Sequence, residues 1–372
     1  MKNSEYVFAV DIGSSKIRTM VAGKGLNNTF NIKGFKEIEY DGFYEGRFLN
    51  QEKISLIFEQ IIDEFDIRVG RDIDKVYISV PSEFSSVHKT EVSINFGDRR
   101  KVKKQDIDSL YYMASEKGKR ADSEIVSVNA NSFILDDGRT TLDPIGESAV
   151  SIIAKLSIIY GDKKFIDLFN GIVASLGFEA IEYISSPLSQ CLFLLPSEKR
   201  EDLALLIDIG DLTSSIAFVQ GDGLYALSSF SRGGGFITND LSQAFDLSMS
   251  EADRLKRQVV LSLKGKPTDT YELLLDNGQT IKISQNACNE VVGYRIDEMA
   301  EVISKCIKLN TRQFSSYLPV ILSGSGLCLL KGGRDYLAKC LGRNIEYGKP
   351  DLPGKEKPEL ASILSLVNSA LD

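Results

Sequence analysis

Two closely similar sequence segments, DIGSSKI at residues 11–17 and DIGDLTSSI at residues 208–216, indicate the fold of this chain. Each segment follows one apolar run and precedes another, which is typical of a strand, a tight turn and a second strand. Each half of the chain then continues as a predicted three-strand meander completed by helices. A duplicated α/β fold, with two lobes on either side of a cleft, is the simplest architecture that explains two such turns.

The composition excludes several classes of function. The 372 residues carry a net charge of −8, which gives no bulk attraction to nucleic acid or anionic lipid. His88 is the only histidine, so a His-rich metal site is excluded. The five cysteines form no C-x-x-C pair, which is typical of buried structural thiols in a reducing compartment. No apolar run approaches the roughly 18 residues of a membrane span, and no signal-peptide pattern opens the sequence. We therefore expect a cytoplasmic protein with no nucleic-acid partner.

The repeated Asp-x-Gly turn is suited to binding phosphate. Its glycine, Gly13 or Gly210, tolerates a positive φ and lets phosphate approach the backbone N–H groups. Its aspartate, Asp11 or Asp208, would repel phosphate but can hold Mg²⁺ through water, because Mg²⁺ keeps most of its hydration shell. Two such loops facing each other would clamp a polyphosphate from both sides, with Lys16 adding a positive charge.

Two further glycine-containing turns fit this plan. LSGSG at 322–326 follows a strand, and its small residues would let an adenine ring lie against the backbone. SRGGG at 231–235 follows the second meander and opens a helix, so it is either a flexible linker or part of the cleft wall.

Local signals predict several other elements. Residues 84–160 indicate a small α+β insertion of a strand, a helix and two more strands. Ser248 and Glu251 are spaced as a helix capping box, and Asn277-Gly278 predicts a hairpin with a type I′ turn. The closing run at 360–371 has helical apolar spacing without the basic flanks of a membrane anchor, so we expect a last core helix.

With these motifs, the sequence resembles the actin-like ATPase superfamily and, within it, the FtsA family of bacterial cell-division proteins. The stretches that carry the resemblance are FAVDIGSSKIRTMVAG, KVYISVPSEFSSVHKTEVSI, FNGIVASLGFEAIEYISSPLSQCLFLLPSEKREDLALLIDIG and SRGGGFITNDLSQAFDLSMSEADRLKR. The pilus-assembly PilM family shares the position of the insertion and remains the nearest alternative.

The resemblance implies an α/β, actin-like duplicated ribonuclease-H-type fold with four subdomains. Their expected ranges are 1–83 with 161–200 for the first core (1A), 84–160 for the inserted α+β subdomain (1C), 201–232 with 289–372 for the second core (2A), and 233–288 for subdomain 2B.

The resemblance also implies ATP and Mg²⁺ as cofactors, with Asp11 and Asp208 holding Mg²⁺ through water. The residues placed at the nucleotide are Asp11, Gly13, Ser14, Ser15 and Lys16 on the first loop, Asp208, Gly210 and Thr213 on the second, Gly233 and Gly234 beside it, Asp253 and Lys256 toward ribose and adenine, and Gly324, Ser325 and Gly326 on the adenosine loop. Arg295 is a weaker candidate. A solvated helix face is the other interpretation of Arg295 and of the Asp253–Lys256 pair.

Two departures from the family pattern argue against fast hydrolysis. The second loop has Asp211 and Leu212 where many relatives have two glycines, which adds charge and bulk near the phosphates. Some relatives carry an acidic residue before the proline of the connecting segment, but here that position is Ser186, which is a poor general base without a partner. We therefore predict ATP binding with slow or weak hydrolysis, and we assign no catalytic residue.

The function implied is a cell-division protein that polymerises into actin-like filaments and links FtsZ filaments to the membrane or divisome. The FtsZ C-terminal tail would dock on subdomain 2B, at about residues 235–283. Membrane contact would be peripheral or through a partner, at the inner face of the cell membrane or the division site. The alternatives are a PilM-like, non-polymerising scaffold that binds a peptide of a membrane partner, and a small-molecule kinase, for which the sequence offers no convincing catalytic aspartate.

Overall fold

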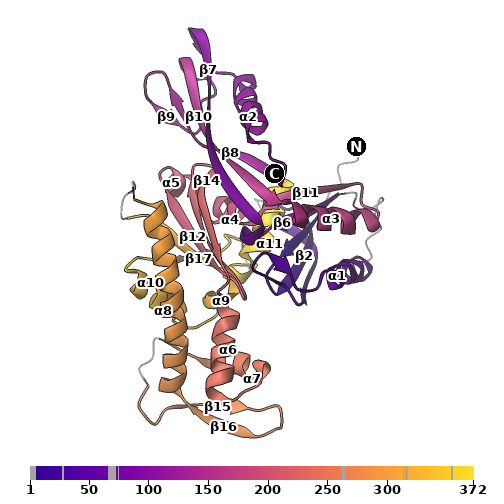
Figure 1. Cartoon of the computed structure of the whole chain (residues 1–372), viewed down its shortest axis with the longest axis vertical. Coiled ribbons are helices and arrows are strands. Elements are labelled where there is room, and N and C mark those ends of the chain that lie inside the picture. The colour runs from indigo at the N-terminus through magenta and orange to yellow at the C-terminus, as the bar shows by residue number, and fades with distance from the viewer. Residues whose placement is uncertain are drawn as a thin grey trace.

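The computed structural model describes residues 6–26, 29–65, 73, 75–261, 265–312, 314, 317–352 and 355–372. Two α/β lobes lie side by side in the middle of an elongated molecule, with one small subdomain above them and another below (Figure 1).

The first lobe is built on a five-stranded sheet of order β11-β6-β1-β2-β3. β1 (Tyr6–Ile12), β2 (Lys16–Lys24) and β3 (Phe30–Glu39) form an antiparallel meander. β6 (Lys75–Val80) and β11 (Ala180–Ser185) then add in parallel. β1 is an almost continuous buried run because both faces of this sheet are covered.

Helices from distant parts of the chain cover these two faces. α1 (Gln51–Glu64) and α3 (Lys163–Ser175) share an apolar core with one face of the sheet. α11 (Ala361–Leu371) packs on the other face and against α4 (Ser186–Leu194). The expectation of a last core helix is confirmed, because Ile363, Leu364, Leu366 and Val367 are fully buried.

The second lobe repeats the first. Its sheet has the order β14-β13-β12-β17-β18, again an antiparallel meander followed by two parallel strands. The strands are β12 (Ala204–Ile209), β13 (Ser214–Gln220), β14 (Gly223–Phe230), β17 (Val320–Ser323) and β18 (Glu346–Tyr347). α8 (Gln285–Asn310) and α10 (Gly333–Leu341) contribute to its core. The duplication expected from the two segments is confirmed.

The upper subdomain is the insertion within the first half, and it has the predicted strand–helix–strand–strand order with one two-residue strand, β9, added before the last strand. Its sheet has the order β7-β10-β8-β9, with α2 packed on it. Its elements are η1 (Ser82–Phe84), β7 (Ser85–Lys101), α2 (Lys104–Gly118), β8 (Ser123–Leu135), β9 (Thr140–Thr141) and β10 (Ser148–Asp162).

The lower subdomain contains α6 (Gly234–Phe245), α7 (Met249–Gln258) and the hairpin of β15 (Thr270–Leu274) and β16 (Thr280–Ser284). Other short elements are β4 (Phe43–Tyr44), β5 (Arg47–Phe48), α5 (Ser197–Arg200), α9 (Ser325–Cys328) and η2 (Pro358–Leu360).

Two local predictions for this subdomain have different outcomes. The capping box is confirmed, because the Glu251 N–H donates to Ser248 Oγ (3.2 Å) and the Ser248 N–H donates to Glu251 Oε2 (2.8 Å). The hairpin is also confirmed, but its type I′ turn is wrong. A type I′ turn needs a positive φ at both central residues, whereas only Gly278 has one (φ 85°) and Asn277 does not. The strand register leaves a longer loop, in which the Gly278 N–H donates to the Leu275 carbonyl (3.0 Å).

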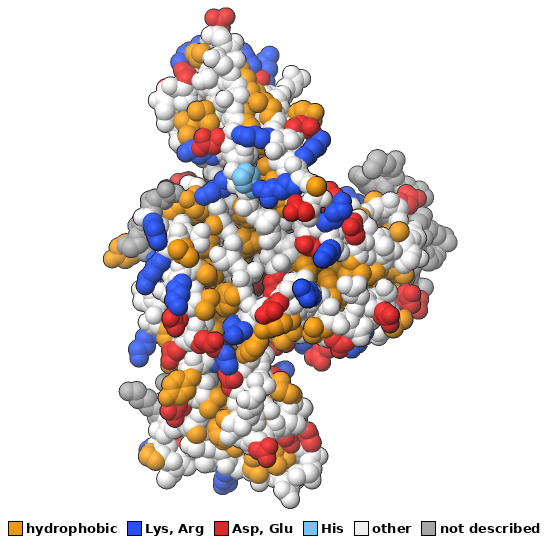
Figure 2. Space-filling view, in the orientation of Figure 1, with side chains coloured by type: hydrophobic (Ala, Val, Ile, Leu, Met, Phe, Trp, Pro, Cys, Tyr) orange, Lys and Arg blue, Asp and Glu red, His pale blue; other side chains and the backbone are white. Residues whose placement is uncertain are grey.

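The surface carries charges of both signs, interspersed on the face shown in Figure 2. Cys191 and Cys288 are buried, as expected, but Cys340 of α10 is exposed, so the expectation of buried thiols is wrong there. No helix in the described ranges is both long and apolar enough to cross a bilayer.

Candidate functional site

The two Asp-x-Gly turns fold in the same way. The Gly13 N–H donates to the Lys16 carbonyl, and the Gly210 N–H donates to the Thr213 carbonyl, each at 2.9 Å. Neither glycine uses the positive φ that glycine tolerates. Glycine is required for space instead, because a Cβ on Gly13 would lie 2.8 Å from the Lys16 oxygen and one on Gly210 would lie 2.9 Å from the Thr213 oxygen.

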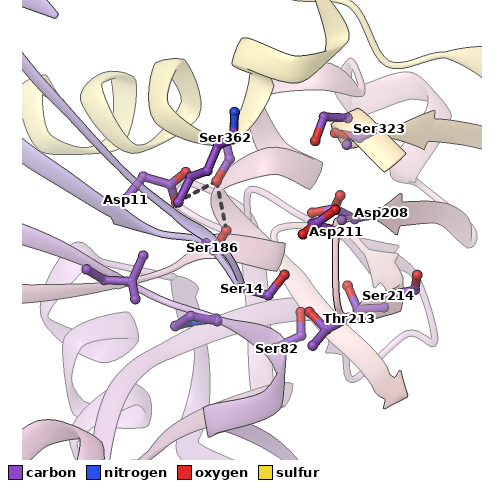
Figure 3. Close-up of a pocket in the computed structure, with 18 of the residues that line it drawn as sticks. Asp11, Ser14, Ser82, Ser186, Asp208, Asp211, Thr213, Ser214, Ser323 and Ser362 are labelled. Atoms are coloured by element: carbon purple, nitrogen blue, oxygen red, sulfur yellow. Dashed lines mark hydrogen bonds between the residues drawn. The ribbon is translucent and has the colours of Figure 1, made fainter. Parts of the chain in front are cut away.

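Both turns open into one cavity between the lobes. The Leu212 N–H of the second loop donates to Ser14 Oγ of the first (3.0 Å), so the loops touch across the cleft. Figure 3 shows labelled side chains of both loops around this hollow. The predicted residues that line the cavity are Asp11, Gly13, Ser14, Ser15, Lys16, Asp208, Gly210, Thr213, Gly324 and Ser325.

A second, wider cavity adjoins the first on the side of the lower subdomain. Ser15, Lys16 and Ser325 are among the residues that line both cavities, so the two share a wall. The remaining predicted residues found here are Gly326, Asp253 and Lys256. The cavity volumes are about 110 Å³ between the loops and about 440 Å³ on the side of the lower subdomain.

Asp11 is held by two groups from distant segments and by one from the neighbouring strand β2. Its Oδ1 accepts hydrogen bonds from the hydroxyls of Ser79 (2.8 Å) and Ser362 (2.7 Å). Its Oδ2 lies 3.9 Å from Arg18 Nη1. The side chain of Asp11 is buried, so these donors keep its carboxylate oriented toward the cavity.

Asp208 has a different environment. Its Oδ2 accepts from Gln190 Nε2 (3.0 Å), and Gln190 Oε1 accepts in turn from the Ser323 hydroxyl (2.8 Å). Burial raises the pKa of Asp208, and the nearby negative charge of Asp11 raises it further. The two carboxylates are therefore close enough to repel each other.

A continuous polar chain joins the two aspartates. From Asp11 it runs through the hydroxyl of Ser362 to that of Ser186 (3.2 Å), and then to Gln190 Nε2 (3.4 Å), which also binds Asp208. The first part of this chain is drawn with dashed lines in Figure 3. Among the described residues, the Ser186 hydroxyl thus has polar partners but no acidic one.

Lys16 lines the phosphate cavity, but its ammonium group also forms ion pairs with two glutamates. Its Nζ lies 2.7 Å from Glu37 Oε1 and 3.3 Å from Glu39 Oε1, both on β3. Burial lowers the pKa of Lys16, but the hydrogen bond with Glu37 raises it, and the net direction is upward. Arg18, which also lines both cavities, donates to Glu37 Oε2 (2.8 Å) and faces Asp11.

Gly233 and Gly234 line neither cavity. They pack behind the second loop, where the Gly234 N–H donates to the Gly210 carbonyl (2.8 Å). A Cβ on Gly234 would overlap the backbone of Gly326, and one on Gly326 would overlap the Gly210 carbonyl. Gly324 has a positive φ of 87° and presses against the Asp208 carboxylate. These glycines let three backbone segments approach one another.

Of the predicted charged residues on helices, Asp253 and Lys256 line the wider cavity, whereas Arg295 does not. Lys256 Nζ donates to Thr238 Oγ1 (2.7 Å) and to the Gly234 carbonyl (3.1 Å), and burial lowers its pKa. Asp253 Oδ1 lies 3.5 Å from Lys256 Nζ. Arg295 lines neither cavity and is bound to both carboxylate oxygens of Asp240 (2.6 and 2.8 Å).

The two residues that replace glycines in the second loop behave differently. Asp211 lines both cavities, so its negative charge enters the cleft. Leu212 lines neither, and it contributes its backbone N–H to the contact with Ser14. The replacement of the two glycines by Asp211 and Leu212 therefore adds a negative charge to the cleft, but the side chain of Leu212 adds no bulk there.

The donor set of the cleft suits a hydrated divalent cation. In the part of the chain that is described, no group of three or more His, Cys, Asp or Glu residues could ligate a metal directly. The cavity instead offers several carboxylates, among them the pair of Asp11 and Asp208 at the ends of the two matching strands. Such a pair can hold Mg²⁺ through its water shell, which would also relieve their mutual repulsion.

Sequence reasoning missed four residues that shape this site: Arg18, Ser79, Gln190 and Ser362. Arg18 could have been found, because a tight hairpin after Asp11 places Arg18 opposite it in the strand register. The other three come from separate segments whose approach has no local signal in the sequence.

Comparison with known proteins agrees with this geometry. The family model described as "Cell division protein FtsA" matches residues 205–365, and that of the "SHS2 domain inserted in FTSA" matches residues 84–160. Together these two ranges cover more than half of the chain.

Full-length relatives extend the match to nearly all of the chain. Cell division protein FtsA of Streptococcus pneumoniae serotype 2 (strain D39) is 22% identical over 370 residues, which cover 98% of this chain and 80% of that protein. The same protein of Bacillus subtilis (strain 168) is 21% identical over 375 residues, which cover 100% of this chain and 84% of that protein.

Solved structures show the same fold at low identity. The PilM-PilN type IV pilus biogenesis complex aligns with a TM-score of 0.64 at 14% identity and covers 98% of both chains. MreB 5 of Spiroplasma citri bound to AMPPNP aligns with a TM-score of 0.58 at 9% identity, over 99% of this chain and 97% of that one. The chain therefore belongs to the FtsA family of cell-division proteins and has an actin-like ATPase fold.

Proposed function

We propose that this chain is an ATP-binding cell-division protein of the FtsA type. The observation that carries this proposal is the pair of identically closed Asp-x-Gly turns that face each other across one cavity. The solved MreB 5 structure of the same fold holds AMPPNP, which supports a nucleotide as the ligand of this cleft.

The nucleotide would span both cavities. Its phosphates would lie between the first loop and the second loop, with Mg²⁺ held through water by Asp11 and Asp208. Its nucleoside would extend past Gly326 into the wider cavity, toward Asp253 and Lys256. In this scheme residues of the predicted subdomains 1A, 2A and 2B line the cleft, and 1C is the inserted α+β subdomain.

Hydrolysis in this cleft would be slow. Ser186 has no acidic partner to make it a base, and Asp211 adds a negative charge beside the phosphates. ATP would then act mainly by favouring one conformation of the two lobes, and through it the self-association of the chain. The measurements that test this are the affinity for ATP with Mg²⁺ and the rate of phosphate release. Undetectable ATP binding would overturn the assignment of the cleft.

The partner surface we propose is subdomain 2B, at about residues 235–283, which would bind the FtsZ C-terminal tail and connect FtsZ filaments to the division site. Met249 and Leu274 are large apolar side chains that are exposed on this subdomain, 53% and 61% respectively. They could contact apolar residues of a bound peptide.

A pull-down with the FtsZ tail peptide tests this surface. The double change Met249→Ser with Leu274→Ser should abolish capture, whereas the matched change Leu56→Ser, on an exposed residue of α1, should not. Family membership favours this function over a PilM-like scaffold, since the likeness to PilM at 14% identity concerns the fold alone. Failure of the unaltered chain to bind the tail, or to form filaments with ATP, would favour the scaffold.

A further inference from the structure

The phosphate cavity contains an acidic side chain that the site described above does not use. Glu83 lies in the short helix η1, which directly follows β6. β6 runs parallel to β1, so the carboxyl ends of both strands lie at the same edge of the sheet, beside the first loop. Glu83 lines the same cavity as Ser14 and Thr213.

The carboxylate of Glu83 is held on one side only. Its Oε1 accepts a hydrogen bond from the hydroxyl of Ser231 (3.0 Å), which belongs to the other lobe. Its Oε2 is buried and has no hydrogen-bond partner among the described residues. Buried carboxylate oxygens are normally paired, so this unpaired oxygen calls for an explanation.

The surroundings of Glu83 favour its protonated form. Burial raises the pKa of Glu83, the hydrogen bond from Ser231 lowers it, and the negative charge of Glu45 raises it, with a net upward direction. Glu45 is exposed in the turn between β4 and β5 and does not line the cavity. An acid with a raised pKa is a better proton acceptor near neutral pH than an ordinary glutamate.

The other carboxylates of the cavity are placed differently. Asp11 already accepts two hydroxyl donors and faces Arg18, and Asp208 accepts from Gln190. Asp211 and Glu359 line the wider cavity on the nucleoside side as well. Glu83 combines a position beside the phosphate loops with a buried, unpaired oxygen.

We infer that Glu83 is the proton acceptor for hydrolysis in this cleft, in the role that Ser186 cannot fill. This inference rests on the proposed function. In the step, the oxygen of a water molecule forms a bond to the terminal phosphorus of ATP, and the bond from that phosphorus to the bridging oxygen of ADP breaks. One proton of the water passes to the Glu83 carboxylate, and inorganic phosphate and ADP leave.

The test separates ATP binding from hydrolysis in the full chain. Binding is measured with a non-hydrolysable ATP analogue and Mg²⁺, and hydrolysis is measured as a single turnover of γ-labelled ATP. Glu83→Gln should keep the affinity within about threefold and slow the single turnover by about 100-fold or more, as loss of a general base does. Glu83→Asp should recover part of the rate, because it restores the carboxylate.

The pH profile provides a readout that a merely structural role would not move. The wild-type rate should rise with pH as Glu83 loses its proton. Glu45→Gln removes a charge that raises the pKa, so it should keep the activity and move this rise to lower pH. Ser231→Ala removes a donor that lowers the pKa, so it should move the rise to higher pH. Glu83→Gln should lack this rise.

Each other result overturns the inference. A Glu83→Gln rate within threefold of the wild-type rate would do so, as would loss of the pH-dependent rise in Asp211→Asn instead. Wild-type protein that binds ATP but never hydrolyses it would refute the role of Glu83 while leaving the proposed binding function standing. Absence of ATP binding would instead refute the proposed function itself.

Discussion

Replacing Gly326 by alanine should push apart the three backbone segments that form the floor of the cleft. A Cβ at this position would lie 2.8 Å from the Gly234 nitrogen, 2.8 Å from the Ile209 oxygen, and still closer to the Gly210 oxygen. Real Cβ atoms essentially never come within 3.0 Å of such neighbours. All three are backbone atoms, so no side chain can rotate away.

The expected cost follows from this geometry. Inserting a methyl group into a closely packed site destabilises a protein by about 1–3 kcal/mol. The displaced Gly210 carbonyl would also weaken its hydrogen bond with the Gly234 N–H (2.8 Å), which is worth about 1 kcal/mol. We therefore expect Gly326→Ala to lower the free energy of unfolding by about 2–4 kcal/mol. The shifted loop should also reduce ATP affinity.

The assay is urea unfolding followed by far-UV circular dichroism, because the chain contains no tryptophan to report by fluorescence. Gly171→Ala is the matched control. Gly171 lies inside α3, and a Cβ there would have no neighbour within 4 Å. The control should therefore stabilise the chain by about 0.5–1 kcal/mol through helix propensity. Equal unfolding midpoints for Gly326→Ala and the wild type, or shifts of the same sign in both variants, would refute the packing argument.

Three further predictions concern charged side chains. Burial and the charge of Asp11 raise the folded-state pKa of Asp208, so the stability linked to this group is present at low pH and is lost as pH rises through that pKa. Asp208→Asn should therefore unfold at a higher urea concentration than the wild type at pH 7, and the difference should shrink on acidification. The same change should weaken Mg²⁺-dependent ATP binding. A lower stability of Asp208→Asn at pH 7 would contradict this reasoning. Arg18→Gln should weaken ATP binding about tenfold in a titration by removing a cavity cation, whereas Arg139→Gln on the inserted subdomain should change it less than twofold. Arg295→Gln should lower the free energy of unfolding by about 1–2 kcal/mol by breaking the ion pair with Asp240, yet leave ATP affinity within about twofold of the wild type. A larger loss of affinity would mean that Arg295 does contribute to nucleotide binding.

Much of the fold was predictable because its signals are local. An Asp-x-Gly turn between two apolar runs depends on a few adjacent residues, and both copies form the same closed turn. The capping box at Ser248 and the apolar stripe of the last helix are local in the same sense. The turn at Asn277 was predicted wrongly because strand register, set by packing along the whole hairpin, fixed the loop length.

The candidate site was predictable only in part. The phosphate loops were found because the chemistry of a glycine turn can be read from its sequence. The roles of the other glycines depend on their neighbours: Gly326 lines the wider cavity and also packs against the second loop, whereas Gly234 only packs. Lys16 carries the charge expected at the phosphates, but the two glutamates of β3 compete for it.

The sequence by itself determined that two similar phosphate-type turns exist, that each begins an α/β lobe, and that an α+β subdomain is inserted in the first half. The tertiary structure decided what surrounds those turns. Ser362 reaches Asp11 from 351 residues away, and Ser231 reaches Glu83 across the cleft. The physical reason is that turns and helix periodicity arise between near neighbours in the chain, whereas burial, charge repulsion and hydrogen-bond partners arise only when the packed lobes bring distant segments together.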